Sequence, residues 1–142
     1  MSYEHLKLEN QLCFALYASS KALIKIYKPL LDQLDITYTQ YITLLVLWDK
    51  DEQTVKELGE KLCLDSGTMT PLLKRLEVMG LIKRQRGLKD ERNVYVVLTQ
   101  KGIEMKDKAL EIPVKAFCST GLSIDEASEL KEKLSLLLKK LQ

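Results

Sequence analysis

A polar helical pattern followed directly by a basic hairpin pattern constrains this chain more than any other feature. The helical pattern covers residues 65–77 and opens with short hydroxyl side chains, namely Ser66, Thr68 and Thr70. Residues 81–86 and 93–98 follow as two short segments with Gly87 between them, and the second is alternating and β-branched, which is typical of paired strands. A helix followed by a charged two-stranded ribbon predicts a winged helix, in which the helix enters the major groove of DNA.

Positive charge gathers in the same segment. Residues 74–92 hold seven basic against three acidic side chains, a net charge of +4, although the whole chain carries only +2, which leaves −2 for the rest. The basic residues are Lys74, Arg75, Lys83, Arg84, Arg86, Lys89 and Arg92. Such a concentration on a nearly neutral chain is expected of a phosphate-binding surface. A basic run alone is more often a solvated surface, so this interpretation depends on the hydroxyl-bearing helix beside it.

The 65–77 pattern separates into an apolar and a polar side. Its predicted buried stripe consists of Met69, Leu72, Leu73 and Leu76. Lys74 and Arg75 fall near the outer face, and Pro71 stands in the opening turns, where its missing N–H group costs least. Hydroxyl side chains and free N–H groups at the start of a helix suit phosphates or base edges. We therefore predict that this segment is a DNA recognition helix.

Length and composition limit the other possibilities. With 142 residues, 46% of them hydrophobic, the chain suffices for one compact domain over 1–142 and is too short for two ordinary ones. No apolar run approaches the roughly 20 residues that cross a bilayer. Residues 1–5 lack a basic region followed by a hydrophobic core. We expect a cytoplasmic protein without membrane contact.

The remaining chain is predicted to be mostly helical. Periodic apolar residues indicate a long helix over about 6–34, in which Pro29 should kink or break the last turns. A second helix should begin after a cap at Thr37, and a short third one should cover 54–62, as the first helix of a helix-turn-helix. Gly80 stands where a left-handed residue closes the recognition helix.

Two helices are predicted after the hairpin. Thr99 is the expected cap of a fifth helix that runs to about Cys118, and residues 119–121 interrupt it. Ser123 and Glu126 form a predicted capping box that opens a last amphipathic helix.

Long helices with wide apolar faces thus stand at both ends of the chain. A winged helix needs only about residues 37–99, so DNA binding does not explain 1–36 and 100–142. Apolar surface of that extent must be covered, and a second copy of the chain is the simplest cover. We expect a homodimer whose recognition helices enter successive major grooves, roughly 34 Å apart, of a pseudo-palindromic double-stranded DNA site. The predicted fold class is mainly α with a small β-wing, a winged helix-turn-helix with N- and C-terminal dimerisation helices.

The cysteine and histidine content argues against metal and enzyme chemistry. The cysteines, Cys13, Cys63 and Cys118, show no Cys-x-x-Cys spacing, so neither a disulfide framework nor a zinc site is expected. Cys63 lies between two leucines and is predicted to be a core residue. His5 is the only histidine, so a His-based catalytic dyad is not expected. We predict no cofactor, no metal and no enzymatic activity.

These motifs together resemble the MarR family of bacterial transcriptional regulators. The resemblance covers essentially the whole chain and rests on the order of the helices, on residues 64–75, and on the wing signature Asp90-x-Arg92 followed by Leu98-Thr99. Residues 11–20, with the sequence Gln-Leu-Cys-Phe-Ala-Leu-Tyr-Ala-Ser-Ser, are similar to the organic-hydroperoxide-sensing branch, which includes staphylococcal redox regulators. The resemblance implies a repressor whose N-terminal cysteine senses an oxidant.

By this resemblance, Cys13 is the peroxide-reactive residue, and Tyr17 and Tyr27 are the tyrosines that hydrogen-bond it. Cys13 and Tyr17 share a helix face, but Tyr27 lies fourteen residues along, about 21 Å up the axis of a continuous helix. Tyr27 would therefore reach only the Cys13 of an antiparallel partner. No basic residue falls within four positions of Cys13, so activation of the thiol must come from tertiary hydrogen bonds or the partner. Without the resemblance, a lone helical cysteine is usually a small buried hydrophobe and such tyrosines are usually interface core.

Cys118 lies where some members of the resembled branch carry a second cysteine, which reacts with the partner's oxidised sensor. The competing interpretation of Cys118 is a buried hydrophobe. The implied switch converts Cys13 to a sulfenic acid with an organic hydroperoxide or similar oxidant, and a disulfide then forms with Cys118 of the other subunit or with a small thiol. The dimerisation helices shift and DNA is released.

In the reduced dimer, the helix over residues 66–75 would contact the major groove, and the wing would contact phosphates or the minor groove. The wing residues in this role are Arg84, Arg86, Lys89 and Arg92, with Asp90 orienting Arg92 through a salt bridge. Two alternatives stay open: a MarR-type repressor controlled by a bound phenolic small molecule, with Cys13 inert, and, more remotely, a cytosolic thiol peroxidase. Against the peroxidase stand the lack of an alternating β-α pattern and of a thioredoxin-like motif.

Overall fold

The computed structural model describes residues 2–87, 90 and 92–142. Two 3-10 turns, Glu4–Leu6 and Leu8–Asn10, precede the regular elements. These are α1 (Leu12–Asp32), α2 (Tyr38–Asp49), β1 (Gln53–Thr54), α3 (Val55–Leu62), α4 (Ser66–Val78), β2 (Ile82–Arg86), β3 (Val94–Leu98), α5 (Gln100–Lys108), α6 (Ile112–Thr120) and α7 (Ile124–Leu141). The predicted class, mainly helical with a small β-wing, is confirmed.

The chain forms two compact units. One unit, Tyr27–Ile112, contains the end of α1, helices α2 to α5 and all three strands, and we call it the winged-helix unit. The other combines Met1–Ile26 with Pro113–Gln142, and we call it the terminal unit.

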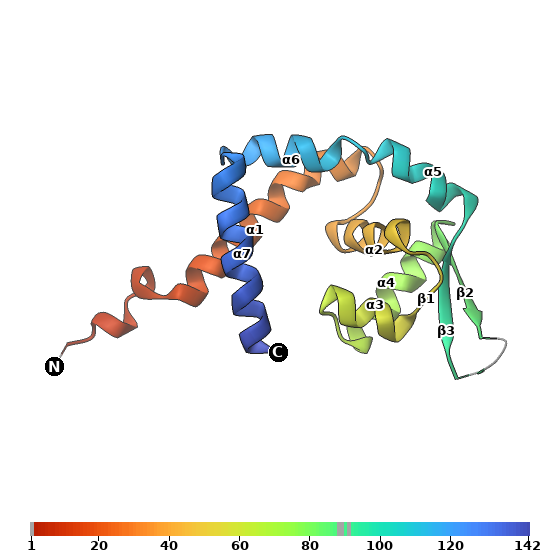
Figure 1. Ribbon diagram of the computed structural model, residues 1–142, viewed down its shortest axis with the longest axis horizontal. Helices are drawn as coiled ribbons and strands as arrows, with labels where there is room; N and C mark the ends of the chain where they lie inside the picture. The colour runs from red at the N-terminus through yellow and green to blue at the C-terminus, as the bar shows by residue number, and fades with distance from the viewer. Residues whose placement is uncertain (1, 88–89, 91) are drawn as a thin grey trace. The chain divides into compact units, whose positions relative to one another are not determined.

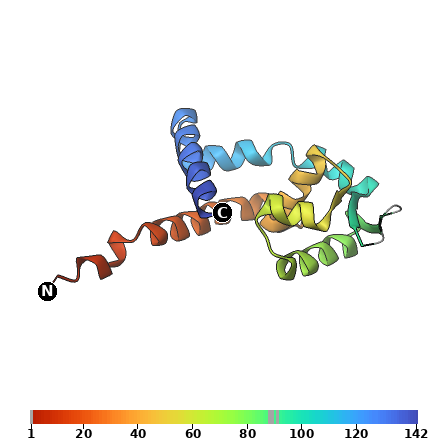
Figure 2. The ribbon, with the colours of Figure 1, turned by 60° about the horizontal axis from the view of Figure 1, so that its bottom comes forward.

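The winged-helix unit packs three short helices on one side of a small antiparallel sheet. The strand order is β1-β3-β2, and the β2–β3 ladder runs from the pair Ile82 and Leu98 to the pair Arg86 and Val94. Figures 1 and 2 both show α2, α3 and α4 on the same side of the strands. Apolar side chains of these helices and of the sheet form one buried cluster, which includes Leu44, Leu47, Leu58, Met69, Leu72, Leu73, Leu76, Leu81, Ile82 and Val96. The stripe predicted on the recognition helix is therefore buried as expected.

The sequence signals at helix ends are also confirmed. Thr37 forms a capping box with Gln40 at the start of α2, and Thr99 caps α5 by accepting a hydrogen bond from the Gly102 N–H. Asp65, which was not predicted as a cap, caps α4 by accepting a 2.8 Å hydrogen bond from the Thr68 N–H. Gly80 follows α4 with φ at +76°. Its N–H donates to the Glu77 carbonyl, and the next N–H donates to the carbonyl of residue 76, the double hydrogen bond of a Schellman motif.

Two expectations about element boundaries are wrong, and the break allowed for at Pro29 does not occur. The first helix begins only at Leu12, because residues 4–10 form the two 3-10 turns. Pro29 does not break α1, which continues to Asp32, since a proline in the last turn removes one hydrogen bond and buried Leu31 still anchors that turn.

The predicted fifth helix is two helices, α5 and α6, interrupted between Ala109 and Glu111. Pro113 explains the interruption, because it has no N–H for the Ala109 carbonyl and its ring would clash with that group. The Ala109 carbonyl instead accepts from the Ile112 N–H at 3.1 Å. The two-residue strand β1, which pairs with β3, was not expected at all.

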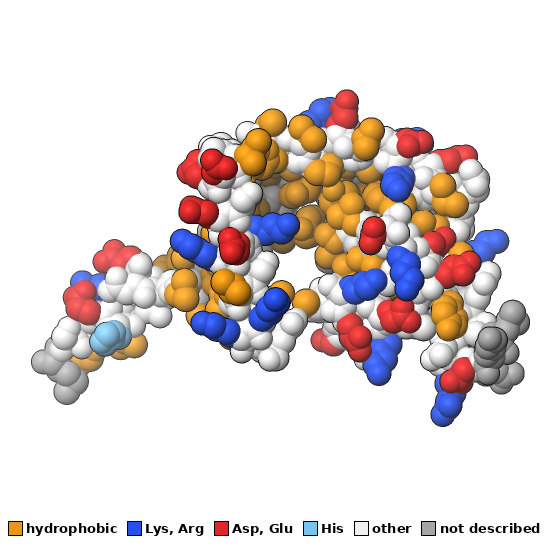
Figure 3. All heavy atoms as spheres, in the orientation of Figure 1, with side chains coloured by type: hydrophobic (Ala, Val, Ile, Leu, Met, Phe, Trp, Pro, Cys, Tyr) orange, Lys and Arg blue, Asp and Glu red, His pale blue; other side chains and the backbone are white. Residues whose placement is uncertain are grey.

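The terminal unit leaves its apolar surface open. Among its described residues only Ala116 is buried. Exposed apolar side chains include Leu12, Phe14, Leu23, Ile24, Val114, Ile124, Leu130, Leu134, Leu136, Leu138 and Leu141. Figure 3 shows several hydrophobic side chains on the surface of α1 and α7. Within the described part of the chain, no helix has the length and apolar character required to span a bilayer.

Candidate nucleic-acid interface and cysteine sites

Helix α4 presents a polar face whose side chains are held by local contacts. Ser66, Thr68 and Thr70 are exposed in its first turns, as predicted. The Thr70 hydroxyl donates to the Ser66 carbonyl at 2.9 Å, which fixes that side chain against the helix. Hydrogen bonds from Thr68 hold the pKa of Asp65 below its usual range, so the cap stays ionised at neutral pH. The start of α4 therefore exposes three hydroxyl groups, of which that of Thr70 is held against the helix.

Basic side chains continue this face along α4. Lys74 and Arg75 are exposed one to two turns after the hydroxyl-bearing residues, and Pro71 is exposed between Thr70 and Lys74. Leu72 and Leu73 point the other way, into the core. The helix thus offers hydroxyl and cationic groups on one side, which is the arrangement that major-groove contact requires.

The wing carries the predicted ion pair. Arg92 Nε lies 3.1 Å from Asp90 Oδ1, and the Arg92 N–H donates to the same oxygen at 3.0 Å. The Arg92 side chain is nevertheless 91% exposed, so the pair orients the guanidinium without covering it. This contact holds the pKa of the Asp90 carboxyl below its usual range. Arg86 is exposed on β2, and Lys89 lies outside the described residues.

Arg84 differs from the other wing cations, because its guanidinium is paired with Glu77 of α4. Arg84 Nε and Nη2 lie 3.3 and 3.2 Å from the two carboxylate oxygens of Glu77. Sequence reasoning grouped Arg84 with the phosphate contacts and gave Glu77 no role. The seven-residue spacing across a helix end carries no recognisable signal for such a pair.

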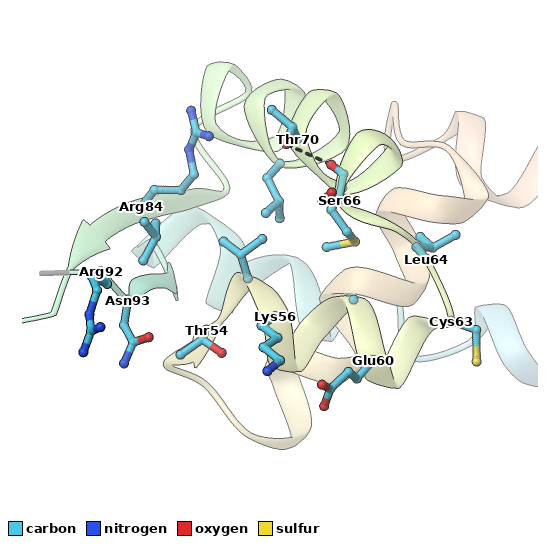
Figure 4. Close-up of a pocket in the computed structure, with 15 residues that line it drawn as sticks. Thr54, Lys56, Glu60, Cys63, Leu64, Ser66, Thr70, Arg84, Arg92 and Asn93 are labelled. Carbon is cyan, nitrogen blue, oxygen red and sulfur yellow. Dashed lines mark hydrogen bonds between the residues drawn. The ribbon is translucent and has the colours of Figure 1, made fainter. Parts of the chain in front are cut away.

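A hollow of about 680 Å³ is lined by residues of α3, α4 and the wing. Its polar lining includes Lys56, Glu60, Ser66, Thr70, Arg84 and Arg92. Figure 4 shows Arg84 extending toward the C-terminal end of α4, whereas Arg92 points away from that helix. The two wing arginines therefore present their charge in different directions.

Cys63 also lines this hollow and is exposed, so its prediction as a core residue is wrong. It ends α3 in the left-handed conformation with φ at +57°. The Leu64 N–H then donates back to the Gly59 carbonyl at 2.9 Å, and this turn directs residue 63 away from the buried face of α3.

The other two cysteines are exposed in the terminal unit. Cys13 lies in the first turn of α1, and Cys118 lies in α6, so Cys118 is not buried within its own chain. Tyr17, one turn after Cys13, is also exposed, and Lys21 Nζ lies 3.4 Å from its hydroxyl. Exposure meets one requirement of a reactive thiol, which is access to the oxidant.

Tyr27 packs in an aromatic cluster with Tyr38 and Tyr41 of α2. Its ring centroid lies 5.1 Å from that of Tyr38, edge to face, and 5.8 Å from that of Tyr41. Burial, followed by the neighbouring tyrosines, raises the pKa of Tyr41 to about 12. Because α1 is continuous from Leu12 to Asp32, Tyr27 lies about 21 Å along the helix from Cys13. Sequence reasoning did not foresee the two α2 tyrosines, whose three-residue spacing places both on one helix face.

Comparison with known proteins gives consistent findings. Residues 25–109 match the family described as transcriptional regulator SarA/Rot. The chain is 52% identical over 139 residues to the organic hydroperoxide resistance transcriptional regulator of Bacillus subtilis (strain 168), a match that spans 98% of this chain and 95% of the relative.

Solved structures extend the similarity to the fold. Reduced AbfR bound to DNA has a TM-score of 0.80 and 39% identity, with 98% of this chain and 96% of that chain covered. Disulfide-formed AbfR has a TM-score of 0.66 and 37% identity, with 97% and 94% covered; AbfR is a protein of Staphylococcus epidermidis. MarR of E. coli, in its apo form, has a TM-score of 0.72 and 25% identity, with 90% and 97% covered.

Proposed function

The chain belongs to the MarR and SarA/Rot family of transcriptional regulators, and we propose that it is a homodimeric repressor that leaves its operator when Cys13 is oxidised. It is a DNA-binding regulator of the redox-sensing type and not an enzyme. The observation that carries the proposal is the exposed polar face of α4 beside a wing whose Arg92 is oriented by Asp90.

On DNA, α4 would lie in the major groove. Ser66, Thr68 and Thr70 would meet base edges or phosphates near the start of the helix, beside Pro71. Phosphates would be contacted by the exposed cations of α4 and the wing, which are Lys74, Arg75, Arg86, Lys89 and Arg92. The wing cations would follow the backbone or enter the minor groove.

The dimer would form through the terminal unit. The exposed leucines of α7 and the apolar residues of α1 form a surface that one chain does not cover. A two-fold partner would bury it and would place two copies of α4 on a pseudo-palindromic site with a spacing of roughly 34 Å.

The switch would begin at Cys13. Its thiolate attacks one oxygen of an organic hydroperoxide, the O–O bond breaks, and the products are a sulfenic acid and the corresponding alcohol. A second thiol then displaces water to form a disulfide, so the hydroperoxide is reduced and two thiols are oxidised. The second thiol would be Cys118 of the partner subunit or a small cellular thiol, and exposure of Cys118 permits the first route.

The aromatic cluster would complete the sensor across the dimer. Tyr27 is too far along α1 to reach its own Cys13, but antiparallel packing of two N-terminal regions would bring it to the partner subunit's Cys13. Because the Tyr27 ring contacts the Tyr38 ring, the Tyr38 hydroxyl would also lie near the partner subunit's Cys13. Tyr17 lies one turn from Cys13 on its own helix. Loss of these contacts on oxidation would shift the dimer and release DNA.

The deciding experiment is fluorescence anisotropy with DNA from the protein's own promoter region, before and after cumene hydroperoxide. Wild type should bind when reduced and be released on oxidation. Cys13→Ser should bind and stay bound, and Cys63→Ser, which removes another exposed thiol, should behave as wild type. Equal release of wild type and Cys13→Ser would refute the sensor role of Cys13, and failure of reduced wild type to bind would refute the operator assignment.

A further inference from the structure

The Glu77–Arg84 pair connects the recognition helix to the wing, and its geometry points to a positioning role. We propose that Glu77 and Arg84 fix the wing against α4 for DNA binding, and that Arg84 does not itself contact phosphate. This inference rests on the proposed function, in which α4 and the wing bind the same DNA site.

Three hydrogen bonds define the pair. Glu77 Oε2 accepts from the Arg84 backbone N–H at 3.1 Å and from Arg84 Nε at 3.3 Å. Glu77 Oε1 accepts from Arg84 Nη2 at 3.2 Å. The carboxylate therefore holds both the side chain and the strand backbone of residue 84, which restrains β2 more than a single side-chain contact would.

The strand position makes this restraint effective. Arg84 pairs with Val96 of β3, which is fully buried, and lies two residues before the last ladder pair, Arg86 and Val94. Beyond that pair the chain leads to Arg92, an exposed cation of the wing. A rotation of β2 relative to α4 would displace Arg92, so a fixed angle at residue 84 places Arg92 for DNA contact.

Charge and exposure distinguish Arg84 from Arg92. Glu77 cancels the charge of Arg84, whose side chain is only 32% exposed, whereas the Arg92 side chain is 91% exposed. A carboxylate beside a DNA-binding surface would by itself repel phosphate. The side-chain hydrogen bond from Arg84 lowers the pKa of Glu77, so the pair stays ionised at neutral pH. The pair adds no net charge to the interface, and its contribution must come from geometry.

The test measures operator affinity of the reduced full-length protein by fluorescence anisotropy over a series of salt concentrations. The variants are Glu77→Gln, Arg84→Gln, Arg84→Lys and the double variant Glu77→Gln with Arg84→Gln. Glu60→Gln is the matched control, because it removes an acidic side chain that lines the same hollow and takes part in none of the contacts above. Circular dichroism and thermal unfolding verify that each variant is folded.

A positioning role predicts that Glu77→Gln weakens DNA binding about three- to tenfold, although it removes a negative charge. Arg84→Lys, which keeps the charge but loses the fork geometry, should weaken binding about as much as Arg84→Gln. The double variant should be no weaker than either single variant. The slope of log Kd against log salt should stay that of wild type, because no phosphate contact is lost.

Opposite results overturn the inference. If Arg84 contacts phosphate and Glu77 merely repels it, Glu77→Gln binds DNA as tightly as wild type or more tightly, Arg84→Lys keeps its affinity, and Arg84→Gln lowers the salt slope by about 1. Arg92→Gln tests the proposed function separately, since it should weaken binding and lower the slope by about 1. If Arg92→Gln binds DNA with the affinity and salt dependence of wild type, the wing contact itself is contradicted, whatever the result for Glu77→Gln.

Discussion

Trp48 donates a hydrogen bond from its indole nitrogen to the carbonyl oxygen of Gly102, 2.9 Å away and 54 residues later in the chain. Lys106 Nζ lies 3.4 Å from the Trp48 carbonyl, so two contacts join the end of α2 to α5. Trp48 is the only tryptophan, and its fluorescence therefore reports on this junction of the winged-helix unit.

Gly102→Ala should destabilise the protein strongly. A Cβ at this position would collide with the Leu81 carbonyl and lie 3.1 Å from a Leu98 methyl carbon, and backbone cannot yield as a flexible side chain can. We expect a loss of about 3 kcal/mol of unfolding free energy, at the upper end for an overpacked site. Urea unfolding followed by Trp48 fluorescence measures it, with exposed Gln100→Ala as the control. A midpoint equal to that of wild type would contradict the packing described.

Gly80 and Cys63 occupy equivalent positions after their helices, so substitutions at these two residues should have opposite effects on stability. Both follow a helix with positive φ, +76° and +57° respectively, where glycine is favoured. Gly80→Ala should therefore cost about 1 kcal/mol of unfolding free energy, and Cys63→Gly should add a few tenths to about 1 kcal/mol. Thermal or urea unfolding of the reduced protein compares them. Destabilisation by both substitutions would show that the Cys63 side chain contributes more than its backbone strain costs.

The sequence predicted helix starts and ends best where one local interaction decides them. Thr37, Thr99 and Ser123 are polar caps, and Gly80 is a left-handed terminus, so a few neighbouring residues suffice. The break between α5 and α6 was missed although Pro113 marks it, because apolar periodicity continued across the gap. Strand β1 is two residues long and exists only through its pairing with β3, a partner about forty residues away.

The candidate site was predictable in kind and less so in detail. The exposure of Ser66, Thr68, Thr70, Lys74 and Arg75 follows from the helical period of the buried leucines. The Glu77–Arg84 pair and the aromatic cluster depend on contacts between elements, which periodicity does not encode. The exposure of Cys63 depends on a backbone conformation that cysteine rarely adopts, so the neighbouring leucines gave the wrong indication.

Tyr41 should make the protein lose stability in alkaline solution. Tyr41 is 3% exposed, and burial raises its pKa from 10.0 to about 12 in the folded state. Because the folded pKa is the higher one, the unfolded chain releases this proton first as pH rises. The stability contribution is complete below pH 10 and is lost as pH rises toward about 12. The free energy of unfolding, measured with urea at several pH values, should fall less steeply with rising alkaline pH for Tyr41→Phe than for wild type. Identical slopes for the two proteins would exclude Tyr41 as a cause.

Cys118 should determine whether oxidation links two subunits covalently. Both Cys13 and Cys118 are exposed in the terminal unit, whose apolar surface we assign to the dimer, so a disulfide between subunits is open to them. With cumene hydroperoxide and no added thiol, wild type and Cys63→Ser should form a covalent dimer on a non-reducing gel, and Cys13→Ser and Cys118→Ser should not. The Cys118→Ser protein should accumulate the Cys13 sulfenic acid, 16 Da heavier by mass spectrometry, since one oxygen atom is added. When a small thiol is then supplied, this variant should form a mixed disulfide and release DNA. A covalent dimer that persists in Cys118→Ser would assign the second thiol to another cysteine.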